Sequence, residues 1–322
     1  MERDVAPDRL LKLSATQECR KECMRSFQGA VLFVDMLGFS ALTRGRLKLT
    51  ESEYMPWKIK PGGTFPHQLL AAQILLAFRK ALMRTGRRFK AVKLAQLSDC
   101  AFLWSEDVCA VTDAGRFLMH EAIEAGLLCR GGLAFGDVHE PNKIDHSIGA
   151  FIVGDAVTRA ATYETMGKGM RIFTDSDTAS EILFKRPHES FQALINPLVG
   201  ETVDEWLWYS PEPILELSRD RLTLRPAIEK LVSCHTMLRY SPRFAWNAAS
   251  PEGCRQLACS IVAVSDAMQK LSQGYGEYEF TVEHLSSAMQ TRKDSIRERV
   301  HKQFSEELLG LAMYRDRKKT RG

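Results

Sequence analysis

The sequence lacks long hydrophobic runs. The longest candidate, residues 69–78, carries Gln73 and falls well short of the roughly 20 apolar residues that a membrane-spanning helix needs. Residues 1–4 are polar and show no apolar core of the kind found in signal peptides. We therefore expect a cytoplasmic protein with no membrane partner.

Cysteine is sparse and scattered along the chain. Eight cysteines among 322 residues show no spacing typical of a disulfide framework, and this usage is typical of a reducing compartment. The pairs Cys19/Cys23 and Cys254/Cys259 leave a zinc site open as an alternative. Buried structural thiols are the commoner use of such residues.

A strong excess of one charge is also missing. A net charge of +4 does not indicate a nucleic-acid partner. Basic residues do gather in the tail, residues 315–321, and in one internal cluster of Arg84, Arg87, Arg88, Lys90 and Lys93. Solvated faces are one interpretation; the other is that part of the internal cluster, including Lys93, attracts a polyanionic nucleotide.

Helical and strand-like patterns alternate along the first two thirds of the chain. The composition, 45% hydrophobic and 26% charged, is that of a globular protein. Because a hairpin interrupts the alternation, we predict an α+β fold of the ferredoxin-like kind, with a mostly antiparallel sheet and flanking helices. The predicted units are a polar helical arm (1–26), a catalytic domain (27–200) and a mostly helical C-terminal extension (201–322).

The individual elements follow from hydrophobic periodicity and turn residues. Strands are predicted at 30–34, 89–97, 101–104, 127–135, 171–174 and 206–209, and helices at 40–46, 69–85, 110–125 and 178–184. Residues 152–164 are predicted to run from a strand end or loop into a helix.

Two aspartates stand at the ends of apolar strand-like runs. Asp35 follows the run 30–34, and Asp99 lies at the tip of the predicted hairpin. An unpaired buried charge is costly, so a carboxylate in this position usually serves an ion or a reaction. On adjacent strands, Asp35 and Asp99 would form a divalent-cation site. The alternative for Asp35 is that it caps the following helix.

Four sequence blocks extend this pattern. They are Phe33, Asp35, Gly38, Phe39, Ser40 and Leu42; then Ser98-Asp99; then Arg130, Gly132, Leu133 and Gly136; then Gly154, Val157 and Ala160. In this order, over about 130 residues, they resemble the catalytic domain of the class III nucleotidyl cyclases, with Ser98 in place of a glycine. The resemblance covers roughly residues 27–190.

The resemblance implies a catalytic chemistry. Asp35 and Asp99 would hold two Mg²⁺ or Mn²⁺ ions, with a backbone carbonyl near Met36 as a further ligand. Gly38, Phe39 and Ser40 would present backbone N–H groups to the nucleotide phosphates. Sites of this class form between two domains, so the single domain here implies a homodimer.

Several positions depart from the purine cyclases. Ala95 and Phe151 stand where those enzymes read the base, and Thr158 and Thr162 stand where an Asn and an Arg assist the transition state. Apolar base positions with an intact metal pair resemble the bacterial Pycsar pyrimidine cyclases, as does the long segment 47–67. This implies conversion of UTP or CTP to cyclic UMP or cyclic CMP, a second messenger read by a separate effector protein in anti-phage defence.

Further site residues are predicted with alternatives. Arg130 either pairs with a structural carboxylate or stabilises charge on the phosphates. Thr158 and Arg159 lie in the stretch where the family places transition-state groups, although a surface arginine is an equal interpretation of Arg159. Tyr54 and Trp57 could stack on a pyrimidine, or pack the insertion that carries them.

Two other functions stay open at this point. One is a purine cyclase with unusual base recognition. The other is a catalytically inactive cyclase-like module that binds a nucleotide or a partner.

Overall fold

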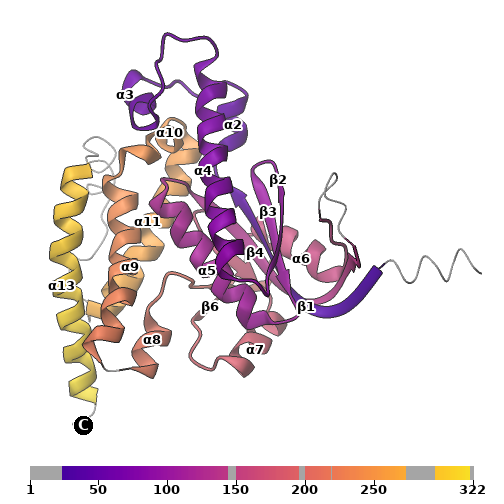
Figure 1. Cartoon of the computed structure of the whole chain (residues 1–322). Coiled ribbons are helices and arrows are strands. Elements are labelled where there is room, and N and C mark those ends of the chain that lie inside the picture. The colour runs from indigo at the N-terminus through magenta and orange to yellow at the C-terminus, as the bar shows by residue number, and fades with distance from the viewer. Residues whose placement is uncertain (1–23, 144–149, 196–199, 219, 273–293, 320–322) are drawn as a thin grey trace, which may run out of the picture.

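The computed structural model describes residues 24–143, 150–195, 200–218, 220–272 and 294–319 (Figure 1). The predicted N-terminal arm therefore lies outside the described residues up to position 23. Residues 24–26, which were assigned to that arm, belong to the first strand. Among the helices described, none combines the length and the apolar content that crossing a membrane requires.

A sheet of seven strands forms the centre of the fold. Its order is β2-β3-β1-β4-β5-β7-β6, and every neighbouring pair is antiparallel except β4 and β5, which are parallel. The strands are β1 (Met24–Met36), β2 (Lys93–Leu97), β3 (Cys100–Ser105), β4 (Cys129–Pro141), β5 (Ile172–Thr174), β6 (Phe191–Ile195) and β7 (Thr202–Trp206). The predicted mixed α+β class is confirmed.

Alternation along β1 divides the sheet into two faces. Ala30, Leu32 and Val34 pack into a large core with helices α4 (Pro66–Arg88) and α5 (Val108–Glu124), which lie in front of the strands in Figure 1. The intervening Val31 and Phe33 face a smaller core beneath α6 (Asp155–Glu164). We call this second surface the α6 face. Because side chains alternate, Asp35 also points to it.

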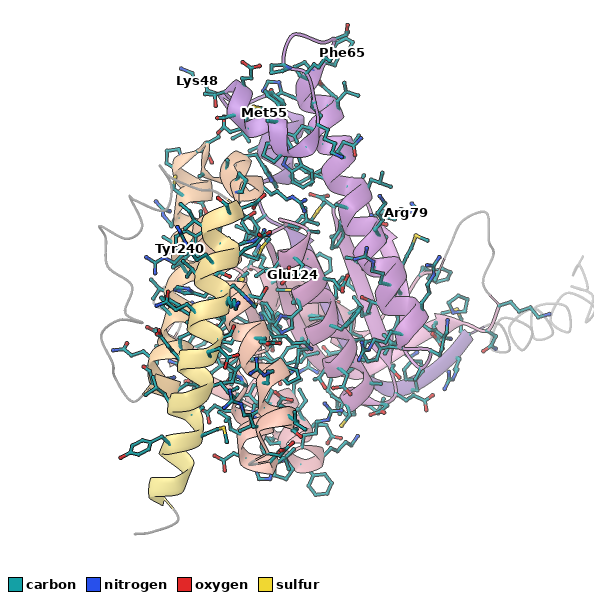
Figure 2. All side chains as sticks on the ribbon, turned by 60° about the vertical axis from the view of Figure 1, so that its left-hand side comes forward. Lys48, Met55, Phe65, Arg79, Glu124 and Tyr240 are labelled. Carbon is teal, nitrogen blue, oxygen red and sulfur yellow. The ribbon has the colours of Figure 1, made fainter. Side chains whose placement is uncertain are left out.

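Helices follow the sheet and pack beside α5. They are α8 (Glu212–Leu217), α9 (Arg221–Tyr240), α10 (Ala245–Ala248), α11 (Pro251–Ser272) and α13 (Asp294–Lys319). Helix α9 lies between α5 and α13, as Figures 1 and 2 both show. The predicted helical C-terminal part is therefore present.

The sheet continues past the predicted domain boundary at residue 200. That boundary separates β6 from β7, although the two strands pair along their whole length. Strand β6 is absent from the prediction because its apolar residues sit at a sheet edge with little burial. The predicted strand 206–209 is instead the end of β7 followed by a turn, in which the Trp208 amide donates to the Trp206 carbonyl at 2.9 Å.

The remaining elements are short or peripheral. They are α2 (Phe39–Thr43), α3 (Glu51–Tyr54), η1 (Met55–Trp57), α7 (Ser176–Lys185) and η2 (Pro242–Phe244).

Candidate active site

Asp35 and Asp99 meet at one end of the sheet. Asp35 is opposite Cys100 in the β1–β3 ladder, and Asp99 is in the turn that joins β2 to β3. The Met36 amide donates to the Asp99 carbonyl at 3.0 Å, so the two carboxylate-bearing segments are joined by a backbone hydrogen bond. The two residues predicted as a pair are thus placed side by side by neighbouring strands.

Ser98 lies in the hairpin turn, at the position where the resembling sequences have a glycine. Ser98 has a φ of 56°, in the left-handed region that side chains disfavour. Glycine adopts this conformation without that penalty. Ser98 is therefore held in a strained conformation at a position where a glycine would fit more easily.

Arg130 bridges Asp35 to a third carboxylate. The two residues are paired in the β1–β4 register, and Arg130 Nη2 lies 3.9 Å from Asp35 Oδ2. The Arg130 Nε atom contacts Glu164 Oε1, and Glu164 is only 5% exposed. Arg130 therefore belongs to the site, and its main partner is Glu164.

Glu164 was missed by sequence reasoning. A signal for it exists, because Ala156, Ala160 and Glu164 recur every four residues and all three are buried on one side of α6. A charged residue on the buried stripe of a helix indicates a specific partner. The partner, Arg130, comes from a strand and is not visible in the local pattern.

The carboxylates oppose each other's ionisation. The pKa of Asp35 is raised from 3.8 to about 7, chiefly by burial and then by the charges of Glu164 and Asp99, with Arg130 only partly offsetting them. The pKa of Glu164 is also raised, by burial. This end of the sheet is thus short of positive charge, which a bound cation would supply.

The chemistry of the available donors selects the kind of cation. Burial and the nearby carboxylates raise the pKa of the Cys100 thiol to about 11, so it stays protonated and is a poor ligand. Asp35, Asp99 and the Met36 carbonyl offer only oxygen atoms, which suit Mg²⁺ or Mn²⁺. The described residues contain no group of three or more His, Cys, Asp and Glu side chains arranged to hold a metal. A cation here would complete its shell with water and substrate oxygens, as Mg²⁺ commonly does.

The loop after Asp35 is tightly held. The Leu37 amide donates to the Leu128 carbonyl at 2.8 Å, and Gly38 has a φ of 83° before the single turn of α2 begins. A Cβ on Gly38 would lie 3.0 Å from Asn247 Oδ1 and 3.1 Å from the Trp246 ring. Both of those residues come from α10 and are almost fully buried. The C-terminal helices thus contact the loop predicted to seat the phosphates, which includes Phe39 and Ser40.

Thr158 and Arg159 lie toward the other end of the α6 face. A Cβ on Gly136 would lie 2.8 Å from Arg159 Nη2, and Gly136 is six strand residues, roughly 20 Å, from Arg130. Within one chain, these residues therefore do not meet Asp35. The exposed Thr158 hydroxyl donates to the Gly154 carbonyl at 3.3 Å.

Arg159 is occupied by structural partners. Its guanidinium donates to Asp155 at 2.7 Å, to Asp175 at 2.6 Å and to the Phe135 carbonyl at 2.5 Å. Asp175 also caps α7 by accepting from the Thr178 amide. Arg159 therefore ties α6 to β4 and α7.

Lys93 and Tyr54 have partners of their own. Lys93 pairs with Trp104 in the ladder, six residues before Asp99 at the hairpin tip, and its Nζ lies 2.7 Å from Glu140 Oε1. Tyr54 is 3% exposed, and its hydroxyl lies 3.4 Å from His67 Nδ1. The burial of Tyr54 fits packing of the insertion better than stacking on a base.

Ala95 and Phe151, the residues predicted to stand at base-reading positions, have apolar or exposed surroundings. Ala95 is paired with Phe102, whose ring centroid lies 4.7 Å from that of Phe33, all on the α6 face. Phe151 is 51% exposed.

Comparison with known proteins adds a likeness of fold. No protein-family model and no curated protein matches this sequence. Among solved structures, the catalytic core of a rhodopsin-guanylyl cyclase with converted specificity, in complex with ATPαS, is 16% identical with a TM-score of 0.38, over 57% of this chain and 97% of that one. The adenylyl cyclase CyaB from P. aeruginosa is 12% identical with a TM-score of 0.40, over 57% and 94%. The guanylate cyclase domain of RhGC from Catenaria anguillulae, in complex with GTP, is 16% identical with a TM-score of 0.38, over 56% and 97%.

Proposed function

We propose that this chain is a nucleotidyl cyclase, which closes a nucleoside triphosphate to a 3′,5′-cyclic monophosphate and releases pyrophosphate. The observation that carries the proposal is the pairing of Asp35 with Asp99 at one sheet end, joined through the Met36–Asp99 hydrogen bond. Attack of a ribose hydroxyl on a phosphate is assisted by bound cations. Two carboxylates at strand ends, beside a glycine turn, are suited to hold such cations.

Asp35 and Asp99 would hold two Mg²⁺ or Mn²⁺ ions, with the Met36 carbonyl as a further oxygen ligand. When bound, the ions acidify the 3′-hydroxyl and neutralise the leaving pyrophosphate. Arg130, held in place by its ion pair with Glu164, adds a positive charge beside Asp35. The Gly38–Ser40 turn orients the phosphates.

A head-to-tail homodimer would complete the site. Asp35 and Thr158 lie toward opposite ends of the α6 face. If two copies packed through this face in antiparallel orientation, Thr158 of each copy would lie near Asp35 of the other. The exposed apolar side chains Leu97 (71%), Phe151 (51%) and Val153 (51%) support such an interface.

The proposed substrate is UTP or CTP. Ala95 and Phe151 offer no hydrogen-bonding group to a purine edge, and the Phe33–Phe102 pair adds apolar surface to the same face. The product, cyclic UMP or cyclic CMP, would act in the cytoplasm on a separate effector protein during anti-phage defence, as in the Pycsar systems that the sequence resembles.

One observation favours a second candidate, a cyclase-like module that binds nucleotide without turning it over. Arg159 is fully engaged in structural ion pairs, and Thr158 and Thr162 replace the usual Asn and Arg. Such a module would bind a triphosphate and release no pyrophosphate.

The test is to incubate the purified protein with each of the four NTPs and Mn²⁺ and to identify products by mass spectrometry. We expect a cyclic pyrimidine monophosphate, lost in Asp35→Asn and in Asp99→Asn but kept in the control Asp177→Asn, which changes an exposed carboxylate on α7. Cyclic AMP or cyclic GMP would overturn the pyrimidine assignment. Unchanged turnover in both site variants would overturn the metal assignment, and nucleotide binding without product would favour the module.

A further inference from the structure

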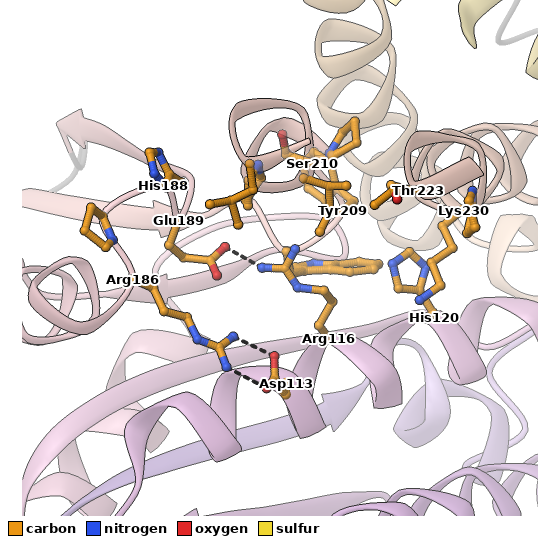
Figure 3. A pocket seen from close by; sticks show the side chains of 18 of the residues that line it. Asp113, Arg116, His120, Arg186, His188, Glu189, Tyr209, Ser210, Thr223 and Lys230 are labelled. Carbon is orange, nitrogen blue, oxygen red and sulfur yellow. Dashed lines mark hydrogen bonds and ion pairs between the residues drawn. The ribbon is translucent and has the colours of Figure 1, made fainter. Parts of the chain in front are cut away.

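A cavity separate from the candidate active site lies between the sheet and the C-terminal helices (Figure 3). It has a volume of about 510 Å³ and is lined by α5, by the segments that follow α7 and β7, and by α8 and α9. This volume is in the range of small-molecule sites. None of the candidate active-site residues lines it.

Two of the cations in the cavity are neutralised by carboxylates. Arg186 makes a two-pronged ion pair with Asp113, with both N–O distances 2.6 Å. Arg116 pairs with Glu189. Both pairs are drawn as dashed lines in Figure 3 and leave this part of the wall close to neutral.

Lys230 differs, because it makes no ion pair with any residue that the structure describes. It lies with His120 at one end of the cavity (Figure 3). Burial lowers the pKa of Lys230, and the charges of Arg88 and Arg116 lower it further. Lys230, which is exposed to solvent on its outer side, therefore brings to this end of the cavity a positive charge that no described carboxylate pairs with.

His120 adds hydrogen-bonding capacity without adding charge. Burial, Lys230 and Arg116 together lower its pKa to about 3, so the ring is neutral at physiological pH. Its Nδ1 lies 3.4 Å from Cys234 Sγ, and its ring meets Trp208 edge-on at 5.1 Å. The Nε2 atom is not used by either contact.

Part of the cavity wall is apolar. Pro213, Ile214 and Leu217 come from α8, and Leu217 is 69% exposed. A cavity with an apolar wall and an unpaired positive charge suits a molecule that has both an apolar body and an anionic group.

We propose that this cavity binds a small organic anion, with its phosphate or carboxylate group beside Lys230, His120 and Arg116 and its apolar body on α8. The anionic group supplies the missing counter-charge, and the body buries the exposed apolar surface of α8.

The cavity wall is also linked to Arg130. Trp208 Nε1 donates to the Met170 carbonyl at 3.0 Å, and the next carbonyl, that of Arg171, accepts from the Gly131 amide at 3.0 Å. Gly131 directly follows Arg130. We therefore expect the bound ligand to change the rate of turnover. This effect rests on the proposed function, whereas binding of the ligand does not depend on it.

Isothermal titration calorimetry tests the binding. The probes are phenyl phosphate, benzoate and inorganic phosphate, and the proteins are the wild type, Lys230→Met, Leu217→Ser and the control Lys302→Met, which changes an exposed lysine on α13. We expect one equivalent of phenyl phosphate or benzoate to bind the wild type more tightly than inorganic phosphate does. The tighter of the two identifies the preferred anionic group.

Lys230→Met should weaken binding at least about tenfold, and Leu217→Ser should weaken it severalfold, while Lys302→Met should leave it unchanged. Absence of binding by both organic anions, or equal binding by Lys230→Met and wild type, would refute the proposal. The melting temperature of Lys230→Met without ligand serves as a control for folding. Removing an unpaired charge should not lower it, and an unchanged value would show that lost binding does not come from unfolding. Turnover assayed with the bound probe then tests regulation separately, since calorimetry does not depend on activity.

Discussion

Arg130 faces Asp35 across the β1–β4 ladder with 3.9 Å between Nη2 and Oδ2, yet its Nε atom is committed to Glu164. One guanidinium is thus shared between two carboxylates, and a third, Asp99, stands next to Asp35. This imbalance is the basis of the pH dependence that we predict for the site.

Binding of Mn²⁺ should depend on pH. Because the pKa of Asp35 is about 7, an incoming cation must displace a proton below that pH. We expect affinity roughly tenfold weaker at pH 6 than at pH 8, since about a tenth of the carboxyl groups are ionised at the lower pH. Calorimetry in two buffers of different ionisation enthalpy would also reveal the released proton. Equal affinity at both values would contradict the raised pKa.

Stability of the metal-free protein should show the opposite trend. The folded-state pKa of Asp35 is above its unfolded value of 3.8, so the folded state holds this proton more tightly. The resulting contribution to stability is fully present below pH 3.8 and is lost as pH rises through about 7. Urea unfolding of wild type and Asp35→Asn at pH 5.5 and pH 8 would isolate it: the variant should lose less stability between the two values. Parallel losses would argue against the assignment to Asp35.

Ser98→Gly should stabilise the protein. The left-handed conformation at φ 56° disfavours serine, and we expect a gain of about 1 kcal/mol in the free energy of unfolding. Ser98→Ala is the matched control, because it removes the hydroxyl but keeps the strained Cβ. A similar gain in both variants would show that the hydroxyl, and not the backbone, carries the effect.

Gly132→Ala should destabilise the fold. A Cβ there would lie 2.0 Å from the Ala160 carbonyl, so α6 would have to move off β4. We expect a loss of more than about 2 kcal/mol in urea unfolding. Gly310→Ala on α13, where a Cβ meets nothing within 4 Å, should instead be neutral or stabilising. A small loss in Gly132→Ala would mean that α6 is loosely seated.

Gly38 and Asn247 should be energetically coupled. A Cβ on Gly38 would press on Asn247 Oδ1 at 3.0 Å, in a backbone conformation with φ 83° that disfavours side chains. In a double-mutant cycle, Asn247→Ala should cost less stability in the Gly38→Ala background than in the wild type, with a coupling of about 0.5–3 kcal/mol. Additive losses would indicate that α10 does not bear on this loop. Turnover of Asn247→Ala would show whether that contact matters for catalysis.

Local patterns predicted the elements that carry Asp35 and Asp99. The apolar run before Asp35 and the hairpin around Asp99 are short-range signals, and β1, β2 and β3 form where these signals lie. Their bounds differ, because β1 extends to Met24–Met36 and β2 begins only at Lys93. Helix α4 also follows its predicted apolar stripe. Strand β6 and the end of β7 could not be placed, because pairing at a sheet edge depends on a neighbour remote in sequence.

Partner choice could not be predicted. Lys93 pairs with Glu140, 47 residues away, and Arg159 reaches Asp175, the N-cap residue of α7. Both are ordinary basic residues in the local pattern, and only the folded chain shows which carboxylate each one meets.

The sequence by itself determined the strand-end aspartates, the glycine turn and the apolar character of positions 95 and 151, because these depend on residue type and short-range periodicity. The tertiary structure alone decided that Glu164 shares Arg130 with Asp35, that α10 closes on Gly38, and that Thr158 lies away from Asp35 on the same face. Those relationships join segments many residues apart, and side-chain packing and long-range ion pairs set them once the sheet and helices have assembled.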